Sequence, residues 1–156
     1  MINIRQELEV AKRASEIAAA LLIDNKDNIN KILSNEGRDV KLKADLESEK
    51  VIKEYLLANS NFPILAEESG ANQDLGNSFW VVDPLDGTSN YSRDFPICCI
   101  SIALIHENEI TLGVINDFNR GSLYEGSIDS GAKLNGTDIF VSSINDKSKA
   151  TLATGL

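Results

Sequence analysis

The hydrophobic residues of this chain change their spacing at Pro63, and this change constrains the fold more than any other feature of the sequence. Before Pro63, apolar side chains recur at steps of three and four residues, the repeat of one face of an α-helix. After Pro63, they occur in short runs bounded by turn-forming residues, as in β-strands. The sequence therefore predicts helices first and a sheet second.

Two amphipathic helices are expected in the first part of the chain. One spans about residues 4–22, and Asn3 followed by Gln6 indicates a capping box at its start. The other spans about residues 44–58, with Asp45 in its first turn, where the helix dipole favours a carboxylate. Each helix has one apolar side, so each is expected to pack against the rest of the domain.

The polar stretch 24–39 between these helices has no clear periodicity. Gly37 indicates a turn, because glycine accepts backbone conformations that other residues avoid. Ile29, Ile32 and Leu33 indicate a short packed element, whose secondary structure the sequence leaves open.

Six short runs after Pro63 are expected to form strands. Turn-forming residues such as Asn135-Gly136 separate the later runs, so hairpins are expected there. With no internal repeat or linker, the simplest interpretation is one α+β unit, in which two long helices pack on a mostly antiparallel sheet. The expected strands are 64–66, 79–82, 97–105, 110–116, 122–125 and 138–141.

The chain carries 24 acidic and 15 basic side chains, a formal net charge of -9. This excess of negative charge argues against nucleic acid and anionic membranes as partners. The adjacent Cys98 and Cys99 cannot form a disulfide framework, so a reducing cytoplasm is expected. The longest apolar run, 97–105, is shorter than the roughly 20 residues of a membrane helix, and the first residues lack the pattern of a secretory signal.

Two predicted strands run directly into acidic residues. The first ends in Glu67 and Glu68, and the second continues into Asp83-Pro84-Leu85-Asp86-Gly87-Thr88. Pro84 fixes its own φ and Gly87 permits unusual φ, so the backbone can bend enough for Asp83 and Asp86 to converge. Carboxylates gathered in this way repel one another unless a hard divalent cation such as magnesium, manganese or calcium neutralises them.

The same turn offers further polar groups. The carbonyl of Leu85 is a candidate metal ligand, and the amides of Gly87, Thr88 and Ser89 can point together at an anion, helped by the dipole of a short helix starting near Thr88. Taken singly, Asp-Pro and Asp-Gly pairs are ordinary turn formers. The coincidence of two acidic strand ends in one small domain is what indicates a metal site here rather than two ordinary loops.

These segments resemble the N-terminal signatures of the inositol monophosphatase family. The match comprises residues 66–69 and 83–91, then Phe95-Pro96, 113–115 and 131–136, in the family's usual order and over nearly the whole chain. The resemblance implies the N-terminal half of a layered αβαβα sugar-phosphatase fold. It assigns residues 1–156 to one metal- and phosphate-binding domain that ends before the second domain and its Trp-Asp motif.

The resemblance also implies roles for individual residues. Glu67, Asp83, the Leu85 carbonyl and Asp86 would hold Mg²⁺, and Glu67 with Thr88 would activate the attacking water. Gly87 and Thr88 would meet the substrate phosphate through their amides, and Glu67, Leu85 and Asp86 would also border the substrate. Asp45 matches the acid of the family's Thr-x-x-Asp segment, which contributes to an additional metal site; here a lysine stands in place of the threonine.

The leading hypothesis is a magnesium-dependent phosphomonoesterase that hydrolyses inositol monophosphate or a related small polyol or sugar phosphate. One alternative within the family is a 3'(2'),5'-bisphosphate nucleotidase, although Asn90-Tyr91 followed by Phe95-Pro96 resembles the inositol monophosphatase branch more closely. The other is a truncated, non-catalytic homologue that serves binding or assembly. A homodimer is a further expectation, because an unpaired domain face promotes association.

Overall fold

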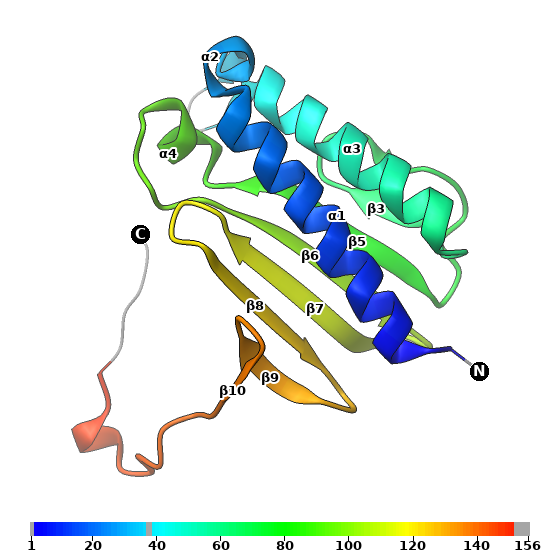
Figure 1. The fold of residues 1–156 in the computed structure, drawn as a ribbon, viewed down its shortest axis with the longest axis vertical. Coiled ribbons are helices and arrows are strands. Elements are labelled where there is room, and N and C mark those ends of the chain that lie inside the picture. The colour runs from blue at the N-terminus through cyan, green and yellow to red at the C-terminus, as the bar shows by residue number, and fades with distance from the viewer. Residues whose placement is uncertain (1, 37–38, 152–156) are drawn as a thin grey trace.

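The chain forms two layers, helices on one side and a sheet on the other (Figure 1). The computed structural model describes residues 2–36 and 39–151. Helices α1 (Ile4–Asp24) and α3 (Lys43–Asn59) pack on one face of an eight-stranded sheet of order β10-β9-β8-β7-β6-β5-β3-β4. The strands are β3 (Ile64–Ala66), β4 (Gly70–Ala71), β5 (Phe79–Asp86), β6 (Cys99–His106), β7 (Glu109–Asp117), β8 (Ser122–Ser127), β9 (Gly131–Leu134) and β10 (Thr137–Ile139).

The predicted α+β class and the mostly antiparallel sheet are confirmed. Within this sheet β3 and β5 run parallel, and every other neighbouring pair is antiparallel. Both predicted helices are present with ends within two residues of those expected. At the start of α1, the side chain of Asn3 accepts from the amide of Gln6, which supplies the predicted cap. No described helix is long and apolar enough to cross a membrane.

The stretch between α1 and α3 forms three short elements. These are helix α2 (Lys26–Ile29) and an antiparallel pair, β1 (Ile32–Glu36) and β2 (Asp39–Leu42). Ile29 is buried as expected, but Ile32 and Leu33 are 60% and 54% exposed, so the idea that they pack is wrong. The strand pair is not part of the main sheet, so Ile32 and Leu33 have no layer that covers their side chains. Gly37 lies outside the described residues.

Strand β5 is longer than predicted, because it continues through Pro84 and Leu85 to Asp86. It does so with an irregular register: Asp83 pairs with Ser101, whereas Asp86 pairs with Cys99. Pro84 and Leu85 on β5 thus oppose the single residue Ile100 on β6, which is a β-bulge. Strands β4 and β9 were not predicted, because short, glycine-containing segments lack an alternating apolar pattern.

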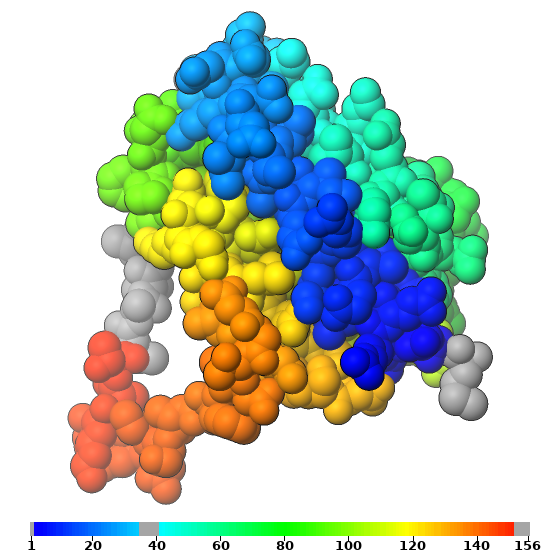
Figure 2. Space-filling view, in the orientation of Figure 1, coloured from blue at the N-terminus to red at the C-terminus, as the bar shows by residue number. Residues whose placement is uncertain are grey.

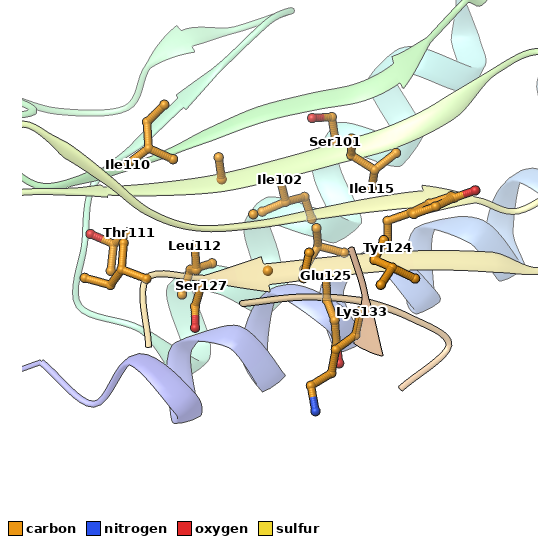
Figure 3. A pocket seen from close by; sticks show the side chains of 17 residues that line it. Ser101, Ile102, Ile110, Thr111, Leu112, Ile115, Tyr124, Glu125, Ser127 and Lys133 are labelled. Carbon is orange, nitrogen blue, oxygen red and sulfur yellow. The ribbon is translucent and has the colours of Figure 1, made fainter. Parts of the chain in front are cut away.

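The two faces of the sheet differ. Ile100, Ile102 and Leu104 of β6 are fully buried beneath the helices, whereas intervening residues face the other side. On that side β6 to β10 border an open, mainly apolar hollow of about 540 Å³, in which Ile110 and Ile115 are 72% and 47% exposed (Figure 3). Residues 140–151, which follow β10, project away from the rest of the molecule (Figure 2).

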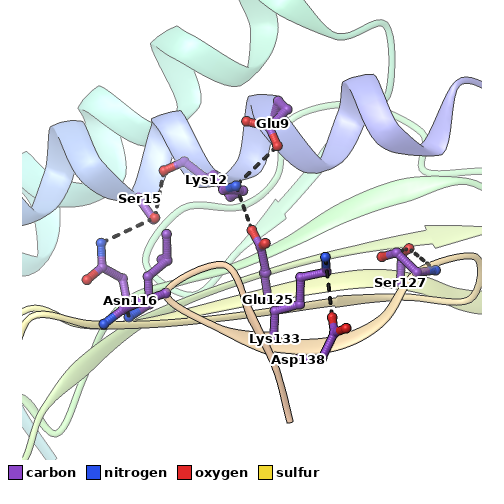
Figure 4. A network of polar contacts seen from close by, with 11 residues as sticks. Glu9, Lys12, Ser15, Asn116, Glu125, Ser127, Lys133 and Asp138 are labelled. Carbon is purple, nitrogen blue, oxygen red and sulfur yellow. Dashed lines mark hydrogen bonds and ion pairs between the residues drawn. The ribbon is translucent and has the colours of Figure 1, made fainter.

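A network of polar side chains joins α1 to the sheet (Figure 4). The ammonium of Lys12 lies 2.7 Å from a carboxylate oxygen of Glu125 on β8 and 3.1 Å from one of Glu9. One turn further along α1, Ser15 accepts a hydrogen bond from the side chain of Asn116 on β7. Glu9 is exposed, but Lys12, Glu125, Ser15 and Asn116 are buried or partly buried, so their pairing removes most of the cost of placing them between the layers.

Candidate functional site

The parallel pairing of β3 with β5 brings the first two predicted acids together. Ala66 is opposite Val82, and the amide of Glu67 donates to the carbonyl of Val82 at 3.1 Å. Glu67 and Asp83 are therefore neighbours at the same end of two adjacent strands, and their carboxyl groups share a hydrogen bond. Such a bond requires a proton on one of the two groups.

The bulge after Asp83 is fixed from the helix layer and from within the turn. The hydroxyl of Ser48 on α3 donates to the carbonyl of Pro84 at 2.8 Å, and both groups are buried. The amide of Leu85 donates to the carboxylate of Asp83, which ties the side chain to its own turn. Asp86 ends the strand and is exposed.

Gly87 occupies a position that other residues cannot take without strain. Its φ is +85°, in the left-handed region, and a Cβ there would lie 2.7 Å from the carbonyl oxygen of Ile97. The residue opens α4 (Thr88–Ser92), the short helix expected from the sequence. The turn therefore depends on glycine both for its backbone conformation and for its closeness to the neighbouring chain.

Thr88 connects the turn to α3. Its hydroxyl lies 2.9 Å from a carboxylate oxygen of Asp45 and 3.0 Å from the carbonyl of Leu85, and its single proton can be donated to either. The other oxygen of Asp45 accepts from the amide of Leu42 at 2.6 Å. The assignment of a lysine to the family's threonine position was wrong, because the residue three positions before Asp45 is Leu42. Leu42 has no hydroxyl group and cannot cap the helix as a threonine would.

Burial and mutual repulsion raise the pKa values of these acids. Glu67 is exposed as a residue, but partial burial of its carboxyl group, and then the charge of Asp83, raise its pKa to about 7. The pKa of Asp83 is also raised, mainly by burial. Burial raises the pKa of Asp45 to about 6, against hydrogen bonds from Leu42 and Thr88 that lower it. Groups held in this state favour either protons or a cation.

The predicted residues form one neighbourhood, but not a ready-made metal cluster. Among residues 2–36 and 39–151, no three His, Cys, Asp or Glu side chains converge as a cation site. Glu67 and Asp83 are paired, Asp86 is close enough to raise the pKa of Asp83, and Asp45 is engaged by two donors. Glu68, in contrast, forms an ion pair with Lys41. The oxygen-only donors and their mutual repulsion fit a hard divalent cation.

A hollow of about 260 Å³ adjoins this neighbourhood. It is bordered by Asp86 and Gly87 on one side and by Asp117 and Arg120 on another. The larger apolar hollow shares Ile115 and Tyr124 with the smaller one but is lined by none of the predicted acids. The smaller hollow is therefore the space from which a ligand can reach the acidic turn.

Sequence reasoning missed Glu49, which is only 5% exposed. Its carboxylate accepts a hydrogen bond of 2.7 Å from the amide of Glu68, so it holds the turn that carries Glu67. The signal was present in the spacing, because Asp45, Ser48 and Glu49 lie three and four residues apart on one helix side. These polar residues lie within the buried stripe of α3.

Comparison with known proteins identifies the family. A profile of the inositol monophosphatase family matches residues 3–156. The chain belongs to the inositol monophosphatase family. It is 35% identical over 157 residues to the inositol-1-monophosphatase of Synechocystis sp., covering 98% of this chain and 54% of that protein. It is 42% identical over 127 residues to the Nus factor SuhB of Xylella fastidiosa, covering 80% of this chain and 45% of that protein.

A solved structure of the family shows the same fold. The inositol monophosphatase from Anabaena (Nostoc) sp. PCC 7120 superposes with a TM-score of 0.77 at 31% identity, over 92% of this chain and 52% of that one. The family resemblance predicted from the acidic segments is thus confirmed, and the general kind of activity in the family is that of a phosphatase. The chain spans about half the length of the relatives it matches.

Proposed function

We propose that this chain supplies the metal- and phosphate-binding half of a magnesium-dependent phosphomonoesterase, with inositol monophosphate or a related small polyol or sugar phosphate as substrate. The observation that carries the proposal is the contact between Glu67 and Asp83 at the end of two parallel strands. Two acids are brought together there with their pKa values raised, an arrangement typical of functional sites.

Each predicted residue has a distinct part in this proposal. Glu67, Asp83, Asp86 and the Leu85 carbonyl would hold Mg²⁺, which lowers the pKa of bound water and offsets phosphate charge. Glu67 would also help to activate the attacking water, together with Thr88.

The turn residues would orient the reacting groups. Thr88 would orient that water, held in turn by Asp45. The amides of Gly87 and Thr88 would bind the phosphate, and Glu67, Leu85 and Asp86 would border the substrate. Asp45 is the weakest of the proposed metal ligands, because both of its oxygens already accept hydrogen bonds.

The alternatives considered from the sequence are not favoured by the comparisons, although Nus factor names also occur among the relatives. Inositol monophosphatase names occur among the relatives at high coverage, as does a fructose-1,6-bisphosphatase/inositol-1-monophosphatase of Aquifex aeolicus at 35% identity. These names favour a phosphatase of small phosphate esters over a bisphosphate nucleotidase or a non-catalytic homologue. A cytoplasmic location and a homodimer remain part of the proposal.

The test is phosphate release from inositol 1-phosphate with and without Mg²⁺. Asp86→Asn keeps the shape of the side chain but removes its charge, so activity should fall by about 100-fold, the upper end of the losses seen even for outer-shell partners of a metal. The matched control is Asp129→Asn, an exposed acid in the turn before β9, which should behave as wild type. An Asp86→Asn variant that releases phosphate as fast as wild type would overturn the proposal.

A further inference from the structure

One side of α3 carries a stripe of polar groups that the catalytic scheme does not use. Ser48 and Glu49 are buried, with exposed fractions of 0% and 5%, on a helix whose buried side is otherwise mostly apolar. Burying a carboxylate is costly unless it is hydrogen-bonded, so such a residue requires an explanation beyond packing. The two side chains point to different acidic strand ends.

Glu49 holds the strand end that carries Glu67. Its carboxylate accepts from the Glu68 amide at 2.7 Å, in the residue directly after Glu67. Its second oxygen lies 3.6 Å from the ammonium of Lys53, which also contacts the hydroxyl of Ser69 at 2.5 Å. The turn after β3 is therefore tied to α3 at two successive residues, Glu68 and Ser69.

Ser48 holds the other strand end. Its hydroxyl donates to the carbonyl of Pro84 at 2.8 Å, between Asp83 and Leu85. The bulged part of β5 lacks a regular partner at this point, since the register to β6 is interrupted between Asp83 and Asp86. The hydrogen bond from α3 therefore takes the place of a ladder contact.

We propose that Ser48 and Glu49 are positioning residues. They fix the turn after β3 and the bulge of β5 to one rigid helix, and so set the distance between Glu67 in the first and Asp83 in the second. The inference rests on the proposed metal site, and it names the residues that hold the ligands of that site in place. Adjacent positions on one helix cannot move independently, so the two acidic turns are held as a unit. A cation then meets ligands that are already placed.

The experiment combines amide exchange, which needs no metal, with binding of Mn²⁺ measured by calorimetry. In Glu49→Ala, exchange of the Glu68 amide should speed up at least 10-fold while amides of β6 stay protected, and Mn²⁺ should bind about 10-fold more weakly. Glu49→Gln keeps an oxygen acceptor and should stay within about 3-fold of wild type in both measurements. Ser48→Ala should weaken Mn²⁺ binding without changing exchange at Glu68.

The matched control is Glu54→Ala, an exposed glutamate on the same helix, which should match wild type. The proposal is overturned if the Glu68 amide exchanges equally fast in Glu49→Ala and Glu54→Ala, or if a wild type that binds Mn²⁺ loses no affinity in Glu49→Ala or Ser48→Ala. Should wild type bind no Mn²⁺ at all, the proposed metal site is wrong, and the exchange result alone decides whether Glu49 holds the turn. If Glu49→Ala does not fold, Mn²⁺ binding by Ser48→Ala still tests the proposal, which is overturned if that affinity equals the affinity of wild type.

Discussion

Two polar regions of this domain treat charge in opposite ways. Between α1 and β8, Lys12 lies between Glu9 and Glu125, so positive and negative groups are matched. At the ends of β3 and β5, Glu67 contacts Asp83, so like groups are placed together and their pKa values rise. The first arrangement holds the helix and the sheet together, whereas in the second the negative charge of the acids is not neutralised and favours binding of a cation.

The difference shows which polar cluster is suited to binding. A matched pair gains nothing from a cation, because its charges already neutralise each other. Clustered acids lower the stability of the metal-free protein and recover it when a cation binds, since a ligand that binds only the folded state stabilises it. Sites that conflict with local stability are where function is expected.

Breaking the matched region should have the largest effect on stability. Lys12→Ala would leave the carboxylate of Glu125, whose side chain is 8% exposed, without its cation. Removing one partner of a buried pair costs about 3 kcal/mol, which urea unfolding would show as a lower free energy of unfolding. The double variant Lys12→Met with Glu125→Leu should recover most of the loss. A single variant as stable as wild type would show that the pair is not a structural tie.

Neutralising the unmatched region should have a smaller, pH-dependent effect of opposite sign. The folded pKa of Glu67 is about 7 against an ordinary 4.5, so the folded state binds the proton more tightly, and this group's contribution to stability is lost as pH rises from about 4.5 to 7. Glu67→Gln removes that loss. Without metal, the melting temperature of Glu67→Gln should therefore exceed that of wild type at pH 7.5.

The same comparison provides its own controls. At pH 4.5 the two melting temperatures should converge, because Glu67 is then protonated in the folded state. Adding Mg²⁺ at pH 7.5 should raise the melting temperature of wild type more than that of Glu67→Gln. A less stable Glu67→Gln at pH 7.5 without metal would show that the acid is not under repulsion.

The smallest effect is expected at the edge of the matched region. Glu9 is 64% exposed, so its contact with Lys12 is screened by water. Glu9→Gln should change the free energy of unfolding by about 0.3 kcal/mol, within the range of surface pairs. Urea unfolding of Glu9→Gln and Lys12→Ala side by side would compare the two losses of unfolding free energy. A loss in Glu9→Gln as large as that in Lys12→Ala would mean that Glu9 is the main partner of Lys12.

Local pattern was sufficient to predict much of the fold. The three- and four-residue repeat located α1 and α3, and turn residues such as Asn135-Gly136 marked the hairpins. The exposure of Ile32 and Leu33 was missed, because a sequence does not show whether a neighbouring layer covers a strand. That question depends on contacts between distant segments.

The candidate site divides in the same way. The acids could be found from their places at strand ends, and the turn glycine from its neighbours in the sequence. The parallel pairing of β3 with β5, which sets Glu67 beside Asp83, depends on strand order and was not predictable from local pattern. The spacing of Glu49 along α3 placed it beside Asp45, but its partner is the backbone amide of Glu68, which leaves no trace in residue type.

The bulge in β5 decides which way the acids point. In a regular strand, residues an odd number apart face opposite sides, so Asp83 and Asp86 would lie across the sheet from each other. The extra residue changes odd to even, as their partners Ser101 and Cys99 show by being two apart. Straightening the bulge at its present length would therefore send one acid to the helix side, so the three-residue spacing of Asp83 and Asp86 and the bulge depend on each other.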